Sequence, residues 1–191
     1  MNAKVYRTIA RLVVIFCAAS CSENAVPVSQ PQTGITNKTL ILYYTRTGKN
    51  EIVAKAVNGF IKNSIIEQVK SNVSVPASAI WYKLPFTKAE IDPIEVNPDE
   101  FNNIILCTPV YLQGISPPIK TVIKEFPLEG KNVAVLATCG GMYFSVFHSF
   151  VNGSLKRRGA NVNGVYVVKV GGKSEEEIEL QVKEHLRKIG F

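Results

Sequence analysis

From residue 39 onward, the sequence predicts an α/β domain with a doubly wound, five-stranded parallel sheet. Short apolar runs alternate with amphipathic segments, as expected when strands and helices follow each other along the chain. Most of these runs are apolar at every position, which is typical of strands buried on both faces. The expected strands are Leu40–Tyr44, Ala79–Tyr82, Ile104–Cys107, Val133–Ala137 and Val165–Val168.

Helices are expected where apolar residues recur every three or four positions. The clearest case is residues 50–68, with apolar positions at Ile52, Val53, Ala56, Val57, Phe60, Ile61 and Ile65. The other expected helices are residues 117–126, 143–158 and 174–189. The last of these opens with Ser174 and Glu177 at capping-box spacing. Residues 84–102 contain three prolines, so the second crossover is expected to be mostly loop, with its helix short or absent.

Length and charge limit the class of protein. At 191 residues the chain is long enough for one well-buried domain and too short for two typical ones. The formal net charge is +7, of which Lys4, Arg7 and Arg11 contribute three, so the rest of the chain is mildly basic. The sequence has no dense run of Lys or Arg, alone or interleaved with aromatic residues, which argues against nucleic-acid binding.

Residues 1–20 have the organisation of a secretory signal peptide. A basic start is followed by a short apolar run over residues 12–19, and a permanent membrane helix would need about 20 apolar residues. The run ends in Ala18-Ala19-Ser20-Cys21, which resembles the lipobox of bacterial lipoproteins. That resemblance implies that Cys21 is lipid-modified and becomes the first mature residue. A plain secretory signal and a frayed apolar N-terminus are the alternatives.

Residues 21–38 are expected to form a flexible tether. After Cys21 the segment shows no periodicity and is rich in Ser, Pro, Gln, Asn and Thr. A coil of about 17 residues spans on the order of 20 Å. Ser22 stands where lipoproteins retained in the inner membrane usually carry aspartate, which favours the outer membrane. The expected location is therefore the bacterial cell envelope, with the chain exported, anchored to a membrane through Cys21, and facing the periplasm.

The turn after the first expected strand is the most informative feature of the chain. The apolar run ends at Thr45, Thr47 and Gly48, and an amphipathic segment begins directly afterwards. In such a strand–turn–helix unit, free backbone N–H groups and the positive end of the helix dipole face the same point. The hydroxyls add donors and the glycine lets the backbone approach closely, so the turn is expected to bind a phosphate. The alternative is an ordinary turn with Asn50 as the helix N-cap.

Two further loops follow expected strands at the same edge of the sheet. One covers residues 108–118 and the other residues 138–144, and both are rich in glycine or proline. Each has an aromatic residue close to its strand, Tyr111 in the first and Tyr143 in the second. Planar side chains for stacking and backbone groups for the polar rim suit a flat aromatic ligand. Together with the phosphate turn, these loops predict a phosphorylated flat cofactor.

Residues 45–50, 108–111 and 138–141, in this order and spacing, resemble the cofactor loops of the flavodoxin family. The resemblance covers about residues 39–189 and implies a flavodoxin-like domain over residues 39–191, with strand order 2-1-3-4-5. It also implies FMN at the carboxyl edge of the sheet, with the phosphate on the 45–50 turn and the ring between the other two loops. The cofactor-binding residues that it implies are Thr45, Arg46, Thr47, Gly48, Lys49, Asn50, Thr108, Pro109, Val110, Tyr111, Gly114, Thr138, Cys139, Gly140, Gly141 and Tyr143.

Within this resemblance, Tyr111 matches the aromatic position of the middle loop, and Gly114 is a candidate for the backbone group that bonds the reduced flavin nitrogen. The chain departs from the family at two points. The phosphate loop of the family commonly ends in Thr or Ser, whereas this one ends in Asn50, whose amide can also donate. Well-known flavodoxins are strongly acidic, and this chain is mildly basic, so their potentials and partners do not transfer to it.

Other reactive residues point to no metal or hydrolytic site. The four cysteines include no CxxC pair. Cys107 is expected to be a small buried hydrophobe. Cys139 is expected to contribute its backbone to the flavin loop, with a redox thiol or a Cys107–Cys139 bridge as alternatives. Gly48-Lys49 is not the end of a Walker A motif, because Asn50 replaces Ser or Thr.

The expected function is electron transfer outside the cytoplasm by an FMN-binding, flavodoxin-like lipoprotein, to a redox partner protein or small acceptor that the sequence does not identify. Because the cofactor carries the chemistry, no catalytic side chain is expected. Two alternatives stay open at this point. One is an FMN-dependent oxidoreductase that reduces quinones or similar acceptors, and the other is a degenerate lipoprotein that keeps the fold without flavin.

Overall fold

The computed structural model describes residues 38–71, 89–111, 114–142 and 145–189. The chain divides into two units, residues 1–35 and residues 36–191, and all described residues belong to the second. The expected signal peptide, Cys21 and most of the tether lie outside the described residues. Among the helices that are described, none is long and apolar enough to cross a bilayer.

Five parallel strands form the sheet, in the order β2-β1-β3-β5-β6. They are β1 (Thr39–Tyr43), β2 (Ser64–Gln68), β3 (Asn103–Tyr111), β5 (Asn132–Cys139) and β6 (Asn161–Lys169). A short sixth strand, β4 (Gly114–Ile115), pairs antiparallel with the end of β3. Counted along the chain, the five parallel strands have the predicted order 2-1-3-4-5, which confirms the predicted fold.

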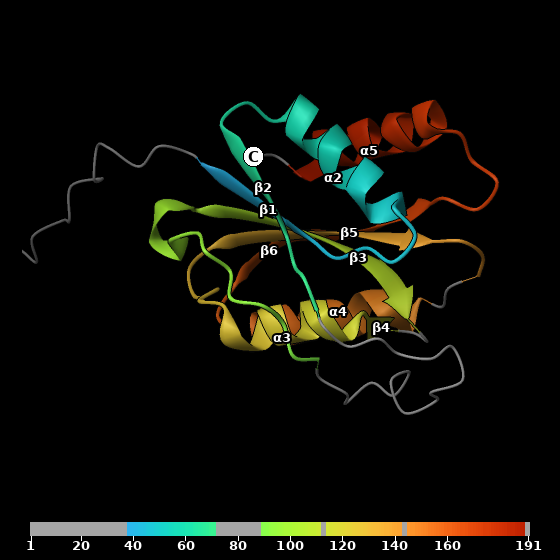
Figure 1. Cartoon of the computed structure of the whole chain (residues 1–191). Coiled ribbons are helices and arrows are strands. Elements are labelled where there is room, and N and C mark those ends of the chain that lie inside the picture. The colour runs from blue at the N-terminus through green and yellow to red at the C-terminus, as the bar shows by residue number, and fades with distance from the viewer. Residues whose placement is uncertain (1–37, 72–88, 112–113, 143–144, 190–191) are drawn as a thin grey trace, which may run out of the picture. The chain divides into compact units, whose positions relative to one another are not determined.

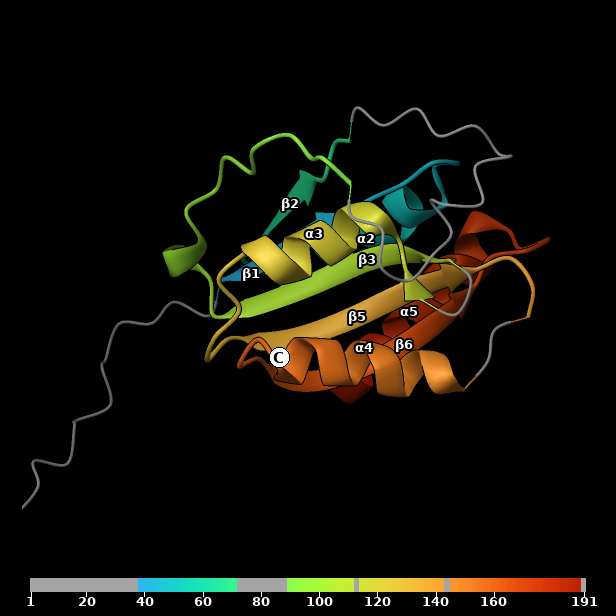
Figure 2. The same cartoon turned by 90° about the horizontal axis from the view of Figure 1, so that it is seen from below.

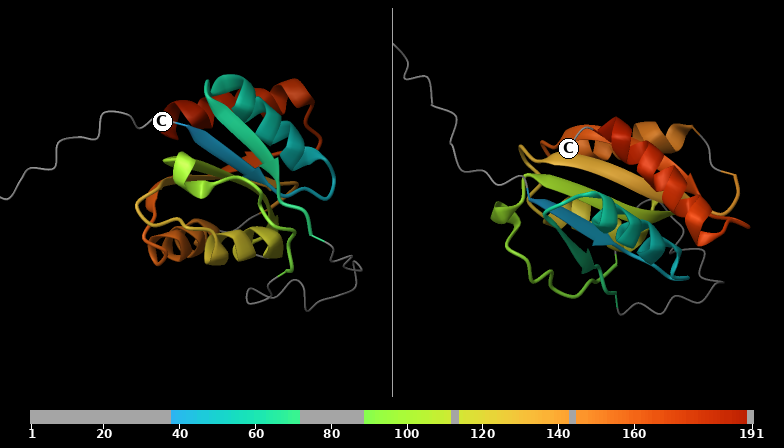
Figure 3. Two further views of the ribbon diagram at one scale, coloured as in Figure 1. Left: turned by 60° about the vertical axis from the view of Figure 1, so that its left-hand side comes forward. Right: turned by 90° about the horizontal axis from the view of Figure 1, so that it is seen from above.

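Helices cover both faces of the sheet, as the doubly wound arrangement requires (Figure 1). The first pair is α2 (Lys49–Phe60) and α5 (Glu175–Ile189), which lie side by side on one face (Figure 3, right). The second pair, α3 (Pro117–Glu125) and α4 (Val146–Lys156), lies on the other (Figure 2). Each layer closes its own apolar core against the buried strands β1, β3 and β5.

The sequence prediction of a helix over residues 50–68 is wrong in its second half. Helix α2 ends at Phe60, and Ser64–Gln68 form β2, the edge strand that pairs with β1. Between them the chain reverses at Asn63, which adopts a left-handed conformation with φ 62°. The expected second strand at residues 79–82 lies outside the described residues. The described part of the crossover from β2 to β3 contains one short 3-10 helix, Pro98–Glu100.

The remaining helices form where the sequence places them. Helix α3 starts at Pro117, whose fixed φ and missing N–H suit a first turn. Helix α5 is preceded by the predicted capping box: the Glu177 carboxylate accepts from the Ser174 N–H at 2.9 Å, and the Glu177 N–H donates to the Ser174 hydroxyl at 3.2 Å. The hydrogen bond from Lys173 lowers the pKa of Glu177, and the Ser174 N–H acts in the same direction.

Candidate functional site

The predicted phosphate turn joins β1 to α2 at the carboxyl edge of the sheet. Gly48 is the N-cap of α2 and has φ 79°, a left-handed conformation that favours glycine. Its carbonyl accepts from the N–H groups of Glu51 and Ile52 at 3.0 and 3.2 Å. The N–H groups of the preceding helical residues, 49 and 50, have no acceptor within the helix. The turn therefore presents backbone donors at the positive end of the α2 dipole.

Two buried polar atoms at this turn lack a partner. Thr45 Oγ1 and Asn50 Oδ1 are both inaccessible to solvent and, among the described residues, make no hydrogen bond. Asn50 is 2% exposed and lies inside α2, so the alternative that it is the N-cap is wrong. Leaving a buried polar group unpaired typically costs about 1–3 kcal/mol. The Thr45 hydroxyl can donate to a phosphate oxygen, whereas Asn50 Oδ1 can only accept and would need a donor group of the ligand. The pair therefore fits a ligand that carries both a phosphate and hydrogen-bond donors.

The predicted loop over residues 108–118 begins as a hairpin rather than as an irregular loop. Strand β3 continues to Tyr111, four residues beyond the expected end at Cys107, and β4 returns beside it with Tyr111 opposite Gly114. Thr108 is fully buried, and its Oγ1 lies 2.9 Å from the Ser116 hydroxyl and accepts from the Ser116 N–H at 3.1 Å. These bonds fasten β3 to the start of α3 and hold the hairpin at the carboxyl edge.

A side-chain hydrogen bond joins the phosphate turn to this hairpin. The Arg46 guanidinium donates to the Tyr111 hydroxyl across 65 positions of sequence. Both side chains belong to predicted cofactor residues, and the contact is solvent-exposed. Pro109 and Val110 are half-buried within β3, and Gly114 is buried in β4. The phosphate turn and the loop over residues 108–118 are therefore adjacent in space, as a ligand that contacts both requires.

The predicted loop over residues 138–144 follows β5 at the same edge. Thr138 and Cys139 are buried within the strand, and Gly140 and Gly141 are exposed just beyond it. The Cys139 thiol donates to the Gly141 carbonyl at 3.2 Å, which holds the turn. Tyr143 lies outside the described residues. The structure thus brings the described parts of all three loops to one edge of the sheet.

A Cys107–Cys139 disulfide is ruled out, since both thiols are free. In the β3–β5 register Cys107 pairs with Leu136, three residues before Cys139. At about 3.3 Å per residue the two cysteines are offset by roughly 10 Å along the strands, beyond the ~7 Å limit for a disulfide. They also belong to the cores on opposite faces of the sheet. Burial raises the pKa of the Cys107 thiol, which agrees with its expected structural role.

Two further residues, Lys120 and Gly171, belong to this edge and were not predicted from the sequence. Lys120, in the first turn of α3, has its side chain close to Gly114, with Nζ 3.8 Å from the position a Gly114 Cβ would occupy. Partial burial lowers the pKa of Lys120. Gly171 follows β6, and a Cβ there would lie 2.1 Å from the Gly140 carbonyl oxygen, so only glycine fits. The Gly171-Gly172 pair, two residues after the end of the last strand, was the available sequence signal.

Cavity volume does not single out the carboxyl edge as the ligand site. A cavity of about 430 Å³ borders the phosphate turn and is lined by Thr47, Gly48, Lys49, Glu51, Ile52, Lys55, Glu175 and Glu179. The larger cavity, about 530 Å³, lies at the opposite edge of the sheet, beside the end of α4. Within the described ranges, no group of three or more His, Cys, Asp and Glu side chains is arranged to hold a metal ion.

The strand order, the helices on both faces and the loops at the carboxyl edge define a flavodoxin-like fold, and solved structures bear this out. A flavoprotein from Lactobacillus acidophilus NCFM, crystallised in complex with FMN, has 27% sequence identity and a TM-score of 0.57, covering 69% of this chain and 93% of that one. A protein from Bacteroides eggerthii DSM 20697 has 15% identity and a TM-score of 0.67, covering 82% and 99%. Oxidised flavodoxin 1 from Bacillus cereus has 20% identity and a TM-score of 0.51, covering 80% and 97%. No protein-family model and no curated protein matches the chain.

Proposed function

We propose that this chain binds FMN at the carboxyl edge of its sheet and transfers electrons as an exported, lipid-anchored flavoprotein. The single observation that carries the proposal is a pair of buried, unpartnered polar atoms at the turn that the flavodoxin resemblance assigns to the phosphate. Thr45 Oγ1 can donate to a phosphate, and Asn50 Oδ1 can accept from a donor group of the same ligand. The likeness to a flavoprotein crystallised with FMN supports the choice of this cofactor.

Different residues at this edge would contact the phosphate and the ring of FMN. The Thr45 and Thr47 hydroxyls and the N–H groups of the turn would hold the phosphate, with Lys49 and the α2 dipole supplying positive potential. Tyr111 would provide a planar wall for the ring. When bound, FMN supplies the electron-transfer chemistry. The protein's part is to fix the ring at the edge and to exclude water from one of its faces.

The spectrum of the purified full chain tests FMN binding. We expect a yellow protein that releases FMN on denaturation and is bleached by dithionite. A matched variant, Asn50→Asp, places a carboxylate against the phosphate and should lose FMN while retaining its far-ultraviolet circular dichroism. A colourless wild-type chain that ignores excess FMN would overturn the proposal and favour a fold without flavin.

The acceptor and the location are tested separately. Electron exchange with a partner protein, without turnover of small acceptors, is expected of a carrier. Steady oxidation of NAD(P)H with a quinone would instead identify an FMN-dependent reductase. For the location, the N-terminal peptide of membrane-associated protein should carry a lipid on Cys21, and Cys21→Ala should abolish that modification.

A further inference from the structure

The five parallel strands begin at one aligned edge of the sheet. Thr39 pairs with both Ser64 and Asn103, Asn103 pairs with Asn132, and Asn132 pairs with Asn161. This amino edge lies opposite the carboxyl edge, where the proposed FMN loops sit. An eight-residue strand such as β5 separates the two edges by about 25 Å.

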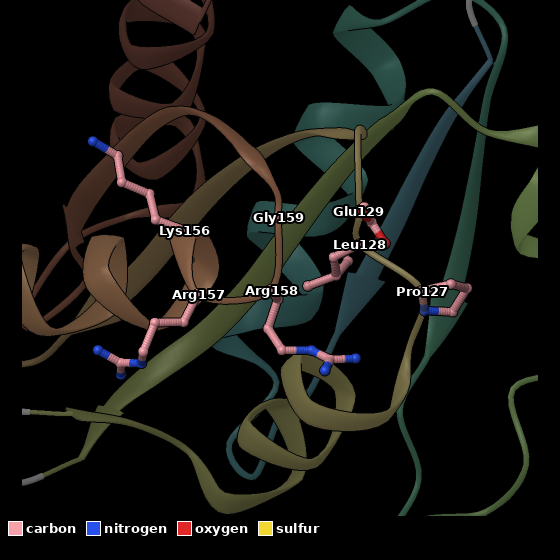
Figure 4. Close-up of a pocket in the computed structure, with 7 residues that line it drawn as sticks. All are labelled: Pro127, Leu128, Glu129, Lys156, Arg157, Arg158 and Gly159. Atoms are coloured by element: carbon pink, nitrogen blue, oxygen red, sulfur yellow. The ribbon is translucent and has the colours of Figure 1, made fainter.

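Cations gather at the amino edge. Helix α4 ends there at Lys156, and Arg157 and Arg158 follow it directly. All three are exposed and line the 530 Å³ cavity together with Pro127, Leu128, Glu129 and Gly159 (Figure 4). Arg158 Nε donates to the Ile123 carbonyl at 3.2 Å, which holds its stem in place. Arg157 Nη2 donates to the Ser154 hydroxyl at 3.2 Å. Of the described residues that line the cavity, Glu129 alone carries a carboxylate.

These three cations are not neutralised locally. Among the described residues, no carboxylate forms an ion pair with Lys156, Arg157 or Arg158. Helix α5 also ends at this edge, because the Asn163 amide donates to the Ile189 carbonyl at 3.3 Å. Its last turn carries Arg187, together with Lys188, which is paired with Glu184 at 2.9 Å. The acidic start of the same helix, Glu175 to Glu177, lies at the carboxyl edge. Positive potential is therefore concentrated at the amino edge.

The expected tether, residues 21–38, would lead into the domain at this same edge. Residue 38 leads directly into β1, and β6 is three strands away across β3 and β5, which corresponds to about 15 Å. A tether of the kind expected from the sequence for residues 21–38 would span on the order of 20 Å. A lipid on Cys21 would thus keep the amino edge within reach of the membrane surface.

We propose that the amino edge docks on anionic phospholipid headgroups through Lys156, Arg157 and Arg158, so that the FMN edge faces away from the membrane. The proposal rests on the lipid anchor of the proposed function. Near an anionic surface each Lys or Arg contributes about fivefold to binding. The cavity beside these cations is open to a phosphate headgroup, and outward-facing flavin loops would remain accessible to a redox partner.

Limited trypsinolysis of the purified full chain, reconstituted into vesicles, tests this orientation. The vesicles contain phosphatidylcholine alone or phosphatidylcholine mixed with phosphatidylglycerol. We expect cleavage after Arg158 to be about tenfold slower on the anionic vesicles, whereas cleavage after Lys169 at the other edge is unchanged. High salt should remove the protection, because the Debye length falls to about 3 Å at 1 M. Equal cleavage on both vesicles would overturn the proposal.

Two charge variants sharpen the test. Lys156→Gln/Arg157→Gln keeps the Arg158 cleavage site and should lose most of the protection on anionic vesicles. Lys70→Gln/Lys169→Gln makes the same change in charge at the carboxyl edge, and cleavage after Arg158 should remain protected. If the control variant loses protection equally, net charge rather than this edge is responsible and the proposal fails.

Further outcomes distinguish a failure of the docking proposal from a failure of the proposed lipid anchor. If the N-terminal peptide carries no lipid, the anchor of the proposed function fails, and low-salt sedimentation with anionic vesicles still tests the edge. Protection by soluble polyglutamate but not by vesicles would identify an acidic protein partner and overturn membrane docking. Protection by inorganic phosphate at the same total phosphate concentration would indicate an ion site and would also overturn it.

Discussion

The Arg46 guanidinium donates a hydrogen bond to the Tyr111 hydroxyl, and this bond connects the turn after β1 to the hairpin after β3. Arg46 lies in the turn after β1 and Tyr111 is the last residue of β3, and the carboxyl ends of these two adjacent strands meet at one edge. A ligand with a phosphate on the turn and a ring against Tyr111 would span the same gap. The bond therefore holds two parts of the proposed FMN site in a fixed relation.

Removing this bond should weaken FMN binding. For Arg46→Gln we expect a loss of about 1 kcal/mol, or roughly fivefold in Kd, measured by quenching of flavin fluorescence. Tyr111→Phe is the matched control, because it removes the same bond and keeps the ring. Equal losses would assign the effect to the bond, and a larger loss for Arg46→Gln would add a direct phosphate contact. Unchanged affinity in both variants would contradict the prediction.

Thr45→Val should affect stability and binding in opposite directions. Its hydroxyl is buried and unpartnered, so a methyl group of similar size should raise the Tm of the FMN-free protein or leave it unchanged. The same change removes a donor to the phosphate and should raise the Kd for FMN about fivefold. Thermal unfolding without FMN and flavin titration give the two values. A lower Tm would mean that the hydroxyl has a structural partner.

Substituting alanine for Gly48, the N-cap of α2, and for Gly59, within the same helix, should change stability in opposite directions. Gly48 has φ 79°, and no atom lies within 4 Å of the point that an added Cβ would occupy, so Gly48→Ala should cost about 1 kcal/mol through backbone strain alone. Gly59 lies inside α2 with equal space and no positive φ, so Gly59→Ala should stabilise by roughly 0.5–1 kcal/mol. Urea unfolding measures both. Two changes of the same sign would contradict the left-handed conformation of Gly48.

Much of this fold could be predicted from sequence, because the buried strands are continuous apolar runs and the helices keep a regular period. Strand β2 could not. It lies at the sheet edge with Ile65 exposed, so it lacks the continuous apolar pattern. Its residues extend the apolar period of α2, and the turn between them uses Asn63 in place of the usual Gly or Pro. Neither pattern marks the end of the helix.

The loops of the cofactor edge could be predicted from the sequence, but the hydrogen bonds between them could not. Threonine, glycine and proline after three strands indicate loops, and their meeting at one edge follows from parallel strands. The Arg46–Tyr111 bond and the Thr108–Ser116 bond depend on the β3–β4 hairpin, whose second strand has two residues. So short a strand has no period that a sequence pattern can reveal.

Lys120 should raise the reduction potential of the flavin. Its ammonium lies beside Gly114, the candidate backbone partner of the reduced ring, and a positive charge there favours the anionic reduced form. Lys120→Gln is therefore expected to make the potential more negative, as measured by anaerobic titration with a reference dye. Lys124→Gln, in an exposed position at the far end of α3, is the control and should leave the potential unchanged. A positive shift for Lys120→Gln would refute this placement of the charge.

His185 should make the protein less stable in mild acid. Its ring stacks on Tyr166 of β6 at 5.1 Å between centroids, and its Nδ1 is buried without a partner among the described residues. Burial lowers the pKa of His185 below 6.5, partly offset by a hydrogen bond with the Val167 backbone. Between the folded and unfolded pKa values the unfolded chain binds more protons, so stability falls as the pH drops below 6.5. His185→Phe keeps the stacking and cannot titrate.

Thermal unfolding from pH 8 to pH 5 compares the two proteins. Above about pH 6.5 the histidine is neutral in both states and contributes no slope. Below that pH the wild-type Tm should fall while the Tm of His185→Phe stays level. The lowered carboxylate pKa values of Glu177 and Glu184 place their loss of stability at more acidic pH, since the ordinary value is 4.5. Parallel curves for the two proteins would show that His185 does not carry the acid sensitivity.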